Sequence, residues 1–105
     1  MANFKDKVIE IILKIPYGRV TTYGSLATLA GMPRCARMIG GILHFNSDRL
    51  NLPWHRVVNR YGYISTSCLD HTKNIQKALL EDEGIEVSDS FIVNLDKYGW
   101  WGEED

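Results

Sequence analysis

The 105-residue sequence predicts a mainly helical α+β domain, with a helix-turn-helix near the N-terminus and a short β-hairpin near the C-terminus. Apolar residues recur at helical spacing early in the chain, and a glycine-containing turn separates two further short helical patterns. Near the C-terminus, two β-type runs flank a polar turn. With 45% hydrophobic residues, the chain suffices for one core and is too short for two ordinary domains, so we expect residues 1–105 to form a single domain.

The first helix is expected from Phe4 to Ile15. Asn3 precedes it and is a good N-cap residue, whereas Pro16 ends the pattern. The apolar residues between them fall at helical spacing on one face, and they are Phe4, Val8, Ile11, Ile12 and Ile15. We therefore expect an amphipathic helix that packs against a core.

Two shorter helices follow and form the expected helix-turn-helix. Thr22 suits the N-cap of the first, which closes at Gly31, and Pro33 suits the first turn of the second, which runs to about His44. The second helix of such a motif commonly lies against DNA. Its two sides differ, because Cys35, Ile39, Ile42 and Leu43 are expected in the core and Arg34, Arg37, Gly41 and His44 outside.

Gly40 and Gly41 are unusual within this third helix, because each glycine costs about 1 kcal/mol of helix stability relative to alanine. Two explanations are open. With Ala36, the glycines add little bulk and would let a groove approach the helix backbone closely. Alternatively, they permit tight packing against another helix.

A fourth helix is expected from near Asp70 to Glu83, with Gly84 as its stop. Its inward face is predicted to contain Ile75, Ala78 and Leu79. The other segments are expected to be irregular or extended: a polar connection at 46–53, an extended piece at 57–58, a turn at 61–63, hairpin arms at 85–87 and 91–95, and a frayed end at 103–105.

The composition argues against several classes of protein. No run of about 18 apolar residues is present for a membrane span, and the N-terminus lacks the order of a secretion signal. Cys35 and Cys68 are too few for a disulfide framework, and no Cys/His spacing forms a zinc quartet. We expect a cytoplasmic protein, nucleoid-associated if bacterial, with free thiols, no metal and no cofactor.

The charge is unevenly distributed along the chain. Residues 11–60 carry seven basic residues against Asp48 alone, whereas residues 61–105 carry three lysines against ten acidic residues. The first half therefore attracts polyanions and is the better candidate for a nucleic-acid surface, although charges of this kind are often merely solvated.

Residues 53–57 read Pro-Trp-His-Arg-Val. They resemble the active-site segment Pro-Cys-His-Arg-Val of the O6-alkylguanine-DNA alkyltransferases, with Trp54 in place of the alkyl-accepting cysteine. That replacement is typical of the alkyltransferase-like proteins. The resemblance covers roughly residues 15–84 and extends to four separate places: residues 15–24 resemble the start of the family's helix-turn-helix, 36–41 its recognition helix, Asn46 its hinge asparagine, and Glu83-Gly84 the end of the helix beneath the active site.

The resemblance implies a winged-helix-like fold, as in the C-terminal domain of these alkyltransferases, that binds duplex DNA through the minor groove. Arg37 is implied to enter the base stack, and Tyr23 to crowd the adjacent phosphate so that the nucleotide rotates out. Thr22, Arg34 and Gly41 complete the implied DNA surface. The residues alone leave open that Arg37 is an ordinary exposed arginine and Tyr23 a packed aromatic.

The implied pocket would hold the flipped O6-alkylguanine. In the reactive family, histidine and glutamate help to form a cysteine thiolate, whereas the indole of Trp54 offers no nucleophile but has a broad apolar face. A buried structural tryptophan is the alternative. The implied lining consists of Tyr23, Asn46, Pro53, Trp54, His55, Arg56, Ser67 and Cys68, with Glu83 as structural support.

This chain departs from the family at the wall of that pocket. Ser67 stands where the family has tyrosine, so a roomier pocket is expected, and Cys68 falls in the same wall as a conceivable second alkyl acceptor. The tail at 98–101 resembles the Tyr-x-Trp-x-Pro ending of alkyltransferase-like proteins, although Gly102 replaces the proline.

The expected function is therefore recognition of DNA damage without enzymatic activity, by a monomer that flags O6-alkylguanine for nucleotide excision repair proteins. Two enzymatic alternatives are residual alkyl transfer to Cys68 and a glycosylase that uses His55 and Glu83. A third alternative is a helix-turn-helix transcription regulator, although the third helix lacks an Asn/Gln set for reading base edges.

Overall fold

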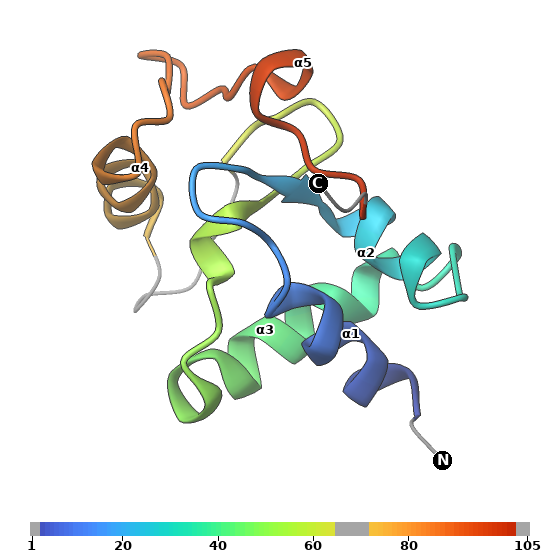
Figure 1. Ribbon diagram of the computed structural model, residues 1–105. Coiled ribbons are helices and arrows are strands. Elements are labelled where there is room, and N and C mark those ends of the chain that lie inside the picture. Colours follow the sequence, from blue (N-terminus) through green and yellow to red (C-terminus); the bar gives the residue numbers. More distant parts are fainter. Residues whose placement is uncertain (1–2, 65–71, 103–105) are drawn as a thin grey trace.

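The computed structural model describes residues 3–64 and 72–102. Three helices, α1 (Phe4–Ile12), α2 (Tyr23–Leu29) and α3 (Ala36–Leu50), pack together at one end of the molecule. The single-turn helix η1 (Trp54–Arg56) leads to the opposite end, where α4 (Lys73–Asp82) and α5 (Leu95–Tyr98) lie (Figure 1). The mainly helical fold class predicted from the sequence is confirmed.

A short parallel sheet joins the two ends. Strand β1 (Thr21–Thr22) pairs with β2 (Val57–Val58), with Thr21 opposite Val57 and Thr22 opposite Val58. This pairing ties the start of α2 to the segment that follows η1. The helix-turn-helix and the Trp54 segment are therefore held to each other by main-chain hydrogen bonds.

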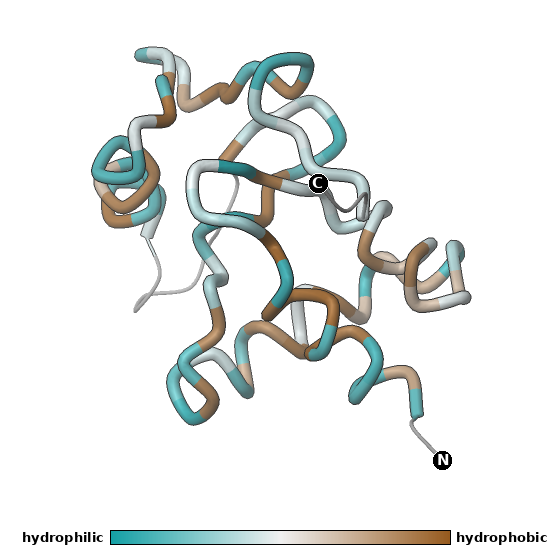
Figure 2. Tube along the Cα trace, in the orientation of Figure 1, coloured by the Kyte–Doolittle hydropathy of each residue, from teal (hydrophilic) through white to brown (hydrophobic). Residues whose placement is uncertain are grey.

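Two groups of buried side chains fill the molecule, and the apolar stretches of α1 and α3 contribute to the first (Figure 2). The first group also takes in α2, Val57 and Trp100. The second lies under α4 and the C-terminal segments and consists of Val20, Val58, Ile64, Leu80, Ile85, Val87 and Val93. Neighbouring residues of β2 enter different groups, so the sheet separates them.

The predicted N-caps of α1 and α2 are confirmed. The Asn3 side chain accepts a hydrogen bond from the Asp6 amide at 2.9 Å, and the Thr22 hydroxyl accepts one from the Ser25 amide at 3.1 Å. Helix α1 ends at Ile12 and not at Ile15, because the amides of residues 14 and 15 bond to carbonyls only three positions back. Ile15 is nevertheless buried, as its place in the apolar pattern indicates.

The predicted bounds of α3 are wrong at both ends. The helix begins at Ala36, since Cys35 has a non-helical ψ of 27° and follows a turn closed by its amide on the Met32 carbonyl. It continues to Leu50 through most of the expected polar connection and ends where Asn51 adopts the left-handed conformation. The polar Asn46 and Ser47 fit inside it because their side chains donate to the carbonyls of Ile42 and Leu43.

The predicted inward face of α4 is also wrong. Ile75 and Leu79 are 44% and 37% exposed, and Ala78 is exposed as well. The helix instead buries Gln76 and Leu80. Thr72 caps α4, so the expected start near Asp70 lies outside the described residues, whereas the stop at Gly84 is confirmed by its positive φ of 84°.

The C-terminal hairpin is reduced to an antiparallel bridge between Val87 and Val93 around the expected turn. Its second arm leaves the first because Ile92 pairs with Tyr63, and the Phe91 carbonyl accepts from the Ile64 amide. The chain then forms the unpredicted helix α5, capped by the Asn94 side chain. A parallel bridge between Val20 and Gly99 returns the tail to β1 and brings Trp100 into the first core.

Candidate nucleic-acid interface

The start of α2 carries two of the predicted DNA-binding residues, Thr22 and Tyr23. The Thr22 side chain is almost fully buried, and besides capping the helix it donates to the Ser25 hydroxyl at 3.1 Å. Tyr23 is half-buried and packs against the first core, and burial raises the pKa of its phenol. The hydroxyl of Thr22 thus holds the helix end, and the phenol of Tyr23 stays neutral at physiological pH.

The outer face of α3 is open. Ile39, Ile42 and Leu43 are buried as predicted, whereas Arg34, Arg37, Gly41 and His44 are exposed. Cβ atoms built on Gly40 and Gly41 would meet no atom within 4 Å among the described residues. Tight packing against another helix therefore does not explain these glycines, and close approach by another molecule remains as their explanation.

Arg37 lies in the first turn of α3 and points away from the cores. Within residues 3–64 and 72–102, its guanidinium makes no hydrogen bond or ion pair. A planar, permanently charged group in this position has its five donors available for an external acceptor.

Asn46, predicted from the resemblance to connect α3 with the loop before Trp54, is buried in the body of α3. Its amide donates to the Ile42 carbonyl at 2.7 Å, and its side-chain oxygen accepts from Arg49 at 2.7 Å. The backbone turn into the loop is made by Asn51, one of two described non-glycine residues with positive φ.

The predicted pocket residues Pro53, Trp54, His55 and Arg56 follow this turn in and just before η1. All four are partly buried. The indole of Trp54 packs against the first core, and its ring meets the His55 ring edge-on with 6.1 Å between centroids. Trp54 thus stands at the boundary between the α1–α3 core and the polar side chains that follow it.

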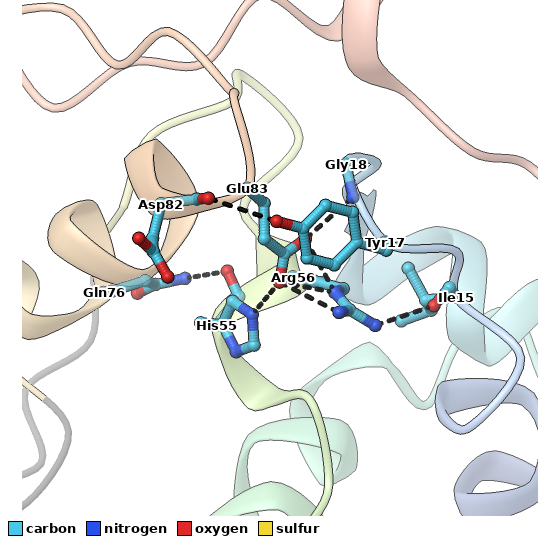
Figure 3. A network of polar contacts seen from close by, with 8 residues as sticks. All are labelled: Ile15, Tyr17, Gly18, His55, Arg56, Gln76, Asp82 and Glu83. Atoms are coloured by element: carbon cyan, nitrogen blue, oxygen red, sulfur yellow. Dashed lines mark hydrogen bonds and ion pairs between the residues drawn. The ribbon is translucent and has the colours of Figure 1, made fainter.

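Glu83, just after α4, collects the polar groups of this region (Figure 3). Its carboxylate accepts from Arg56 Nε at 3.0 Å and from the Gly18 amide at 2.8 Å, and its Oε2 lies 2.5 Å from His55 Nε2. Arg56 also donates to the Ile15 carbonyl at 3.0 Å. One carboxylate therefore joins η1, α4 and the turn after α1.

These contacts control the charge of Glu83. Burial alone raises the pKa of its carboxyl, but hydrogen bonds from Arg56, the Gly18 amide and His55 outweigh burial and lower the pKa below its usual value. Glu83 is therefore a carboxylate at neutral pH. The segment retains a polarised histidine beside Trp54, whose indole has no lone pair or acidic hydrogen to use as a nucleophile.

Two residues of this region were missed in the sequence. Gln76 is 2% exposed, and its amide donates to the carbonyls of His55 and Val57 at 2.9 and 3.0 Å. The Tyr17 hydroxyl donates to the Asp82 carbonyl at 3.1 Å, and its ring lies 5.7 Å from the Arg56 guanidinium carbon. A polar residue between apolar neighbours was the only signal for Gln76, and periodicity placed it on the wrong face.

The remaining predicted pocket residues, Ser67 and Cys68, lie outside the described residues. Among residues 3–64 and 72–102, no three His, Cys, Asp or Glu side chains are grouped to hold a metal ion. Every helix in the same ranges is too short or too polar to cross a membrane.

Residues 3–85 match the family described as 6-O-methylguanine DNA methyltransferase, DNA binding domain. The chain belongs to this family. It is 46% identical to the DNA base-flipping protein of Escherichia coli K12 over 98 residues, covering 93% of this chain and 74% of the relative. It is 38% identical to Alkyltransferase-like protein 1 of Schizosaccharomyces pombe over 104 residues, covering 95% and 96%.

The fold is similar to a solved structure of this second relative. The crystal structure of S. pombe Atl1 in complex with damaged DNA containing O6-carboxymethylguanine matches with a TM-score of 0.85 and 37% identity, covering 95% of this chain and 98% of that one. The similarity to alkyltransferase-like proteins predicted from residues 53–57 is thus confirmed over nearly the whole chain.

Proposed function

We propose that this protein recognises alkylation damage in DNA and performs no chemistry on it. It binds duplex DNA through the minor groove, rotates O6-alkylguanine out of the helix and holds the base in a pocket walled partly by Trp54. The observation that carries this proposal is the combination at η1: Trp54 occupies the position of the nucleophile, while the His55–Arg56–Glu83 contacts around it are complete.

The open face of α3 supports binding in the minor groove. Gly40 and Gly41 leave room for a duplex to reach the helix backbone, and Arg37 has no partner among the described residues. A guanidinium of this kind fills the space left by a flipped base and donates to the orphaned partner base. Flipping costs a few kcal/mol, and less where an alkyl group has already weakened the base pair.

Trp54 supplies recognition in place of reaction. Stacking a base on an aromatic side chain is worth about 1–3 kcal/mol, and the indole face also suits an apolar alkyl group. Alkyl transfer to this residue would require a nucleophile that indole does not provide. The complex is therefore long-lived, and we propose that it marks the lesion for nucleotide excision repair proteins.

A binding series tests this function. Duplexes that differ only in the O6 substituent of one guanine are titrated with the protein at fixed salt, because affinity for DNA depends strongly on ionic strength. The proposal expects tighter binding to every alkylated duplex than to the guanine control. Equal affinity for all duplexes would refute lesion recognition, and affinity that follows flanking sequence would favour a transcription regulator.

A further inference from the structure

The outer face of α3 has two unlike edges. With Arg37 as reference and about 100° per residue, His44 falls about 20° to one side, whereas Gly41, Phe45 and Met38 fall about 40°, 80° and 100° to the other. The face thus has a basic edge at Arg37, a bare centre at Gly41 and an apolar edge formed by Met38 and Phe45. The sequence analysis identified the first two and left the apolar edge unexplained.

Phe45 is 78% exposed, more than any other large apolar side chain among the described residues, and Met38 is 54% exposed. Phe45 lies on the rim of α3, where its ring meets the ring of His44 edge-on at 4.8 Å between centroids. An aromatic side chain this exposed loses the free energy of burial in the unbound protein.

We infer that Met38 and Phe45 form a second, apolar contact with DNA, in which Phe45 lies against the deoxyribose wall of the minor groove. The inference rests on the proposed function, because it places α3 in that groove. Arg37 and Phe45 are about 12 Å apart along the helix axis, so both reach one groove segment when Gly41 approaches its floor. Asp48, one turn beyond His44 on the same face, marks where the basic character of the face ends.

The apolar contact serves a purpose that charge does not. A minor groove about 6 Å wide must open to admit a helix, and apolar side chains of proteins that bind there stabilise the opened or kinked duplex. Deoxyribose presents mainly C–H groups, so Phe45 would bury apolar surface on both partners. Arg37 would act inside the base stack while Phe45 holds the wall.

The dependence of binding on salt distinguishes this contact from an electrostatic one. Phe45→Ala should weaken binding to alkylated and to undamaged duplex about tenfold, and leave the slope of log affinity against log salt unchanged. Arg37→Ala should weaken binding to both duplexes and also reduce that slope by about one. Phe45→Leu keeps an apolar side chain and should retain most of the affinity.

Leu13→Ala is the matched control, because Leu13 is exposed at the end of α1 and lies outside this face. Affinity of Phe45→Ala equal to that of the wild-type protein, or a reduced salt slope, would overturn the inference. So would an unchanged affinity together with a change in self-association measured by sedimentation. Failure of the proposed function gives a different result, in which the wild-type protein does not discriminate alkylated from undamaged duplex while Phe45→Ala still binds both more weakly.

Discussion

The His55 ring nitrogen Nε2 lies 2.5 Å from the Glu83 carboxylate, although no nucleophile precedes His55 in the chain. The same carboxylate accepts from Arg56 and from the Gly18 amide. Glu83 therefore connects three segments of the molecule that are far apart in sequence. In this chain, the contacts that accompany a reactive cysteine in related alkyltransferases hold the Trp54 segment in position.

Replacing Glu83 with Gln should lower the free energy of unfolding by about 3 kcal/mol, because Arg56 then loses a buried charged partner. Since the folded-state pKa of Glu83 is lowered, its stabilising contribution is present above the unfolded-state pKa and is lost as pH falls through the folded value. Urea denaturation at a series of pH values measures both effects. The exposed Glu81→Gln serves as control, and a variant as stable as wild type at pH 7 would show that the carboxylate does not join these segments.

Replacing Gln76 with Met tests the other support of the same segment. The carbonyls of His55 and Val57 would lose their buried donor, at a cost of about 1–3 kcal/mol for each unsatisfied group. We expect a lower urea midpoint and a smaller preference for alkylated DNA, because η1 is less firmly held. Glu81→Met on the exposed side of α4 is the control, and undiminished stability of Gln76→Met would argue against this role.

Replacing Gly41 with Ala separates folding from binding. The new methyl group would meet no described atom within 4 Å, and the helix would gain about 1 kcal/mol of propensity, which raises Tm by about 4 °C. DNA affinity should nevertheless fall, because the methyl group stands between the helix backbone and the groove floor. Asn74→Ala on α4 should stabilise the protein without this loss. Unchanged affinity of Gly41→Ala would mean that no close approach occurs at this position.

Replacing Trp54 with Ala should act mainly on discrimination. The preference for O6-alkylguanine over guanine should fall about tenfold, since stacking a base on an aromatic is worth about 1–3 kcal/mol. Parallel titrations of the two duplexes provide the ratio, and circular dichroism checks that the variant is folded. An equal loss of affinity for both duplexes would indicate that Trp54 supports the core and does not contact the flipped base.

Periodicity predicted those parts of the fold where apolar spacing and a capping residue agree. Asn3 and Thr22 cap their helices as expected, and Ile39, Ile42 and Leu43 face the core. The end of α3 was missed because polar residues were interpreted as a loop. Their side chains bond to the preceding turn of the helix, and sequence alone does not distinguish that use from a connection.

The face of α4 was wrong for a tertiary reason. Ile75 and Leu79 follow the apolar pattern, but Gln76 has two carbonyls of the Trp54 segment to satisfy. Those carbonyls come from a segment about 20 positions earlier in the chain, so periodicity within α4 carries no information about them. The candidate site was more predictable than this helix, because its motif is local and the Glu83 match fixed the distant partner.

The central claim is that the protein holds the alkylated base and leaves both molecules chemically unchanged. Its most direct test is to saturate a duplex containing one O6-alkylguanine with the protein, then determine the intact masses of the protein and of the recovered DNA strand. The expected result is a stable complex from which both components return at their original masses. A protein heavier by the alkyl group with an equally lighter DNA strand, or a strand that has lost its modified base, would contradict the claim.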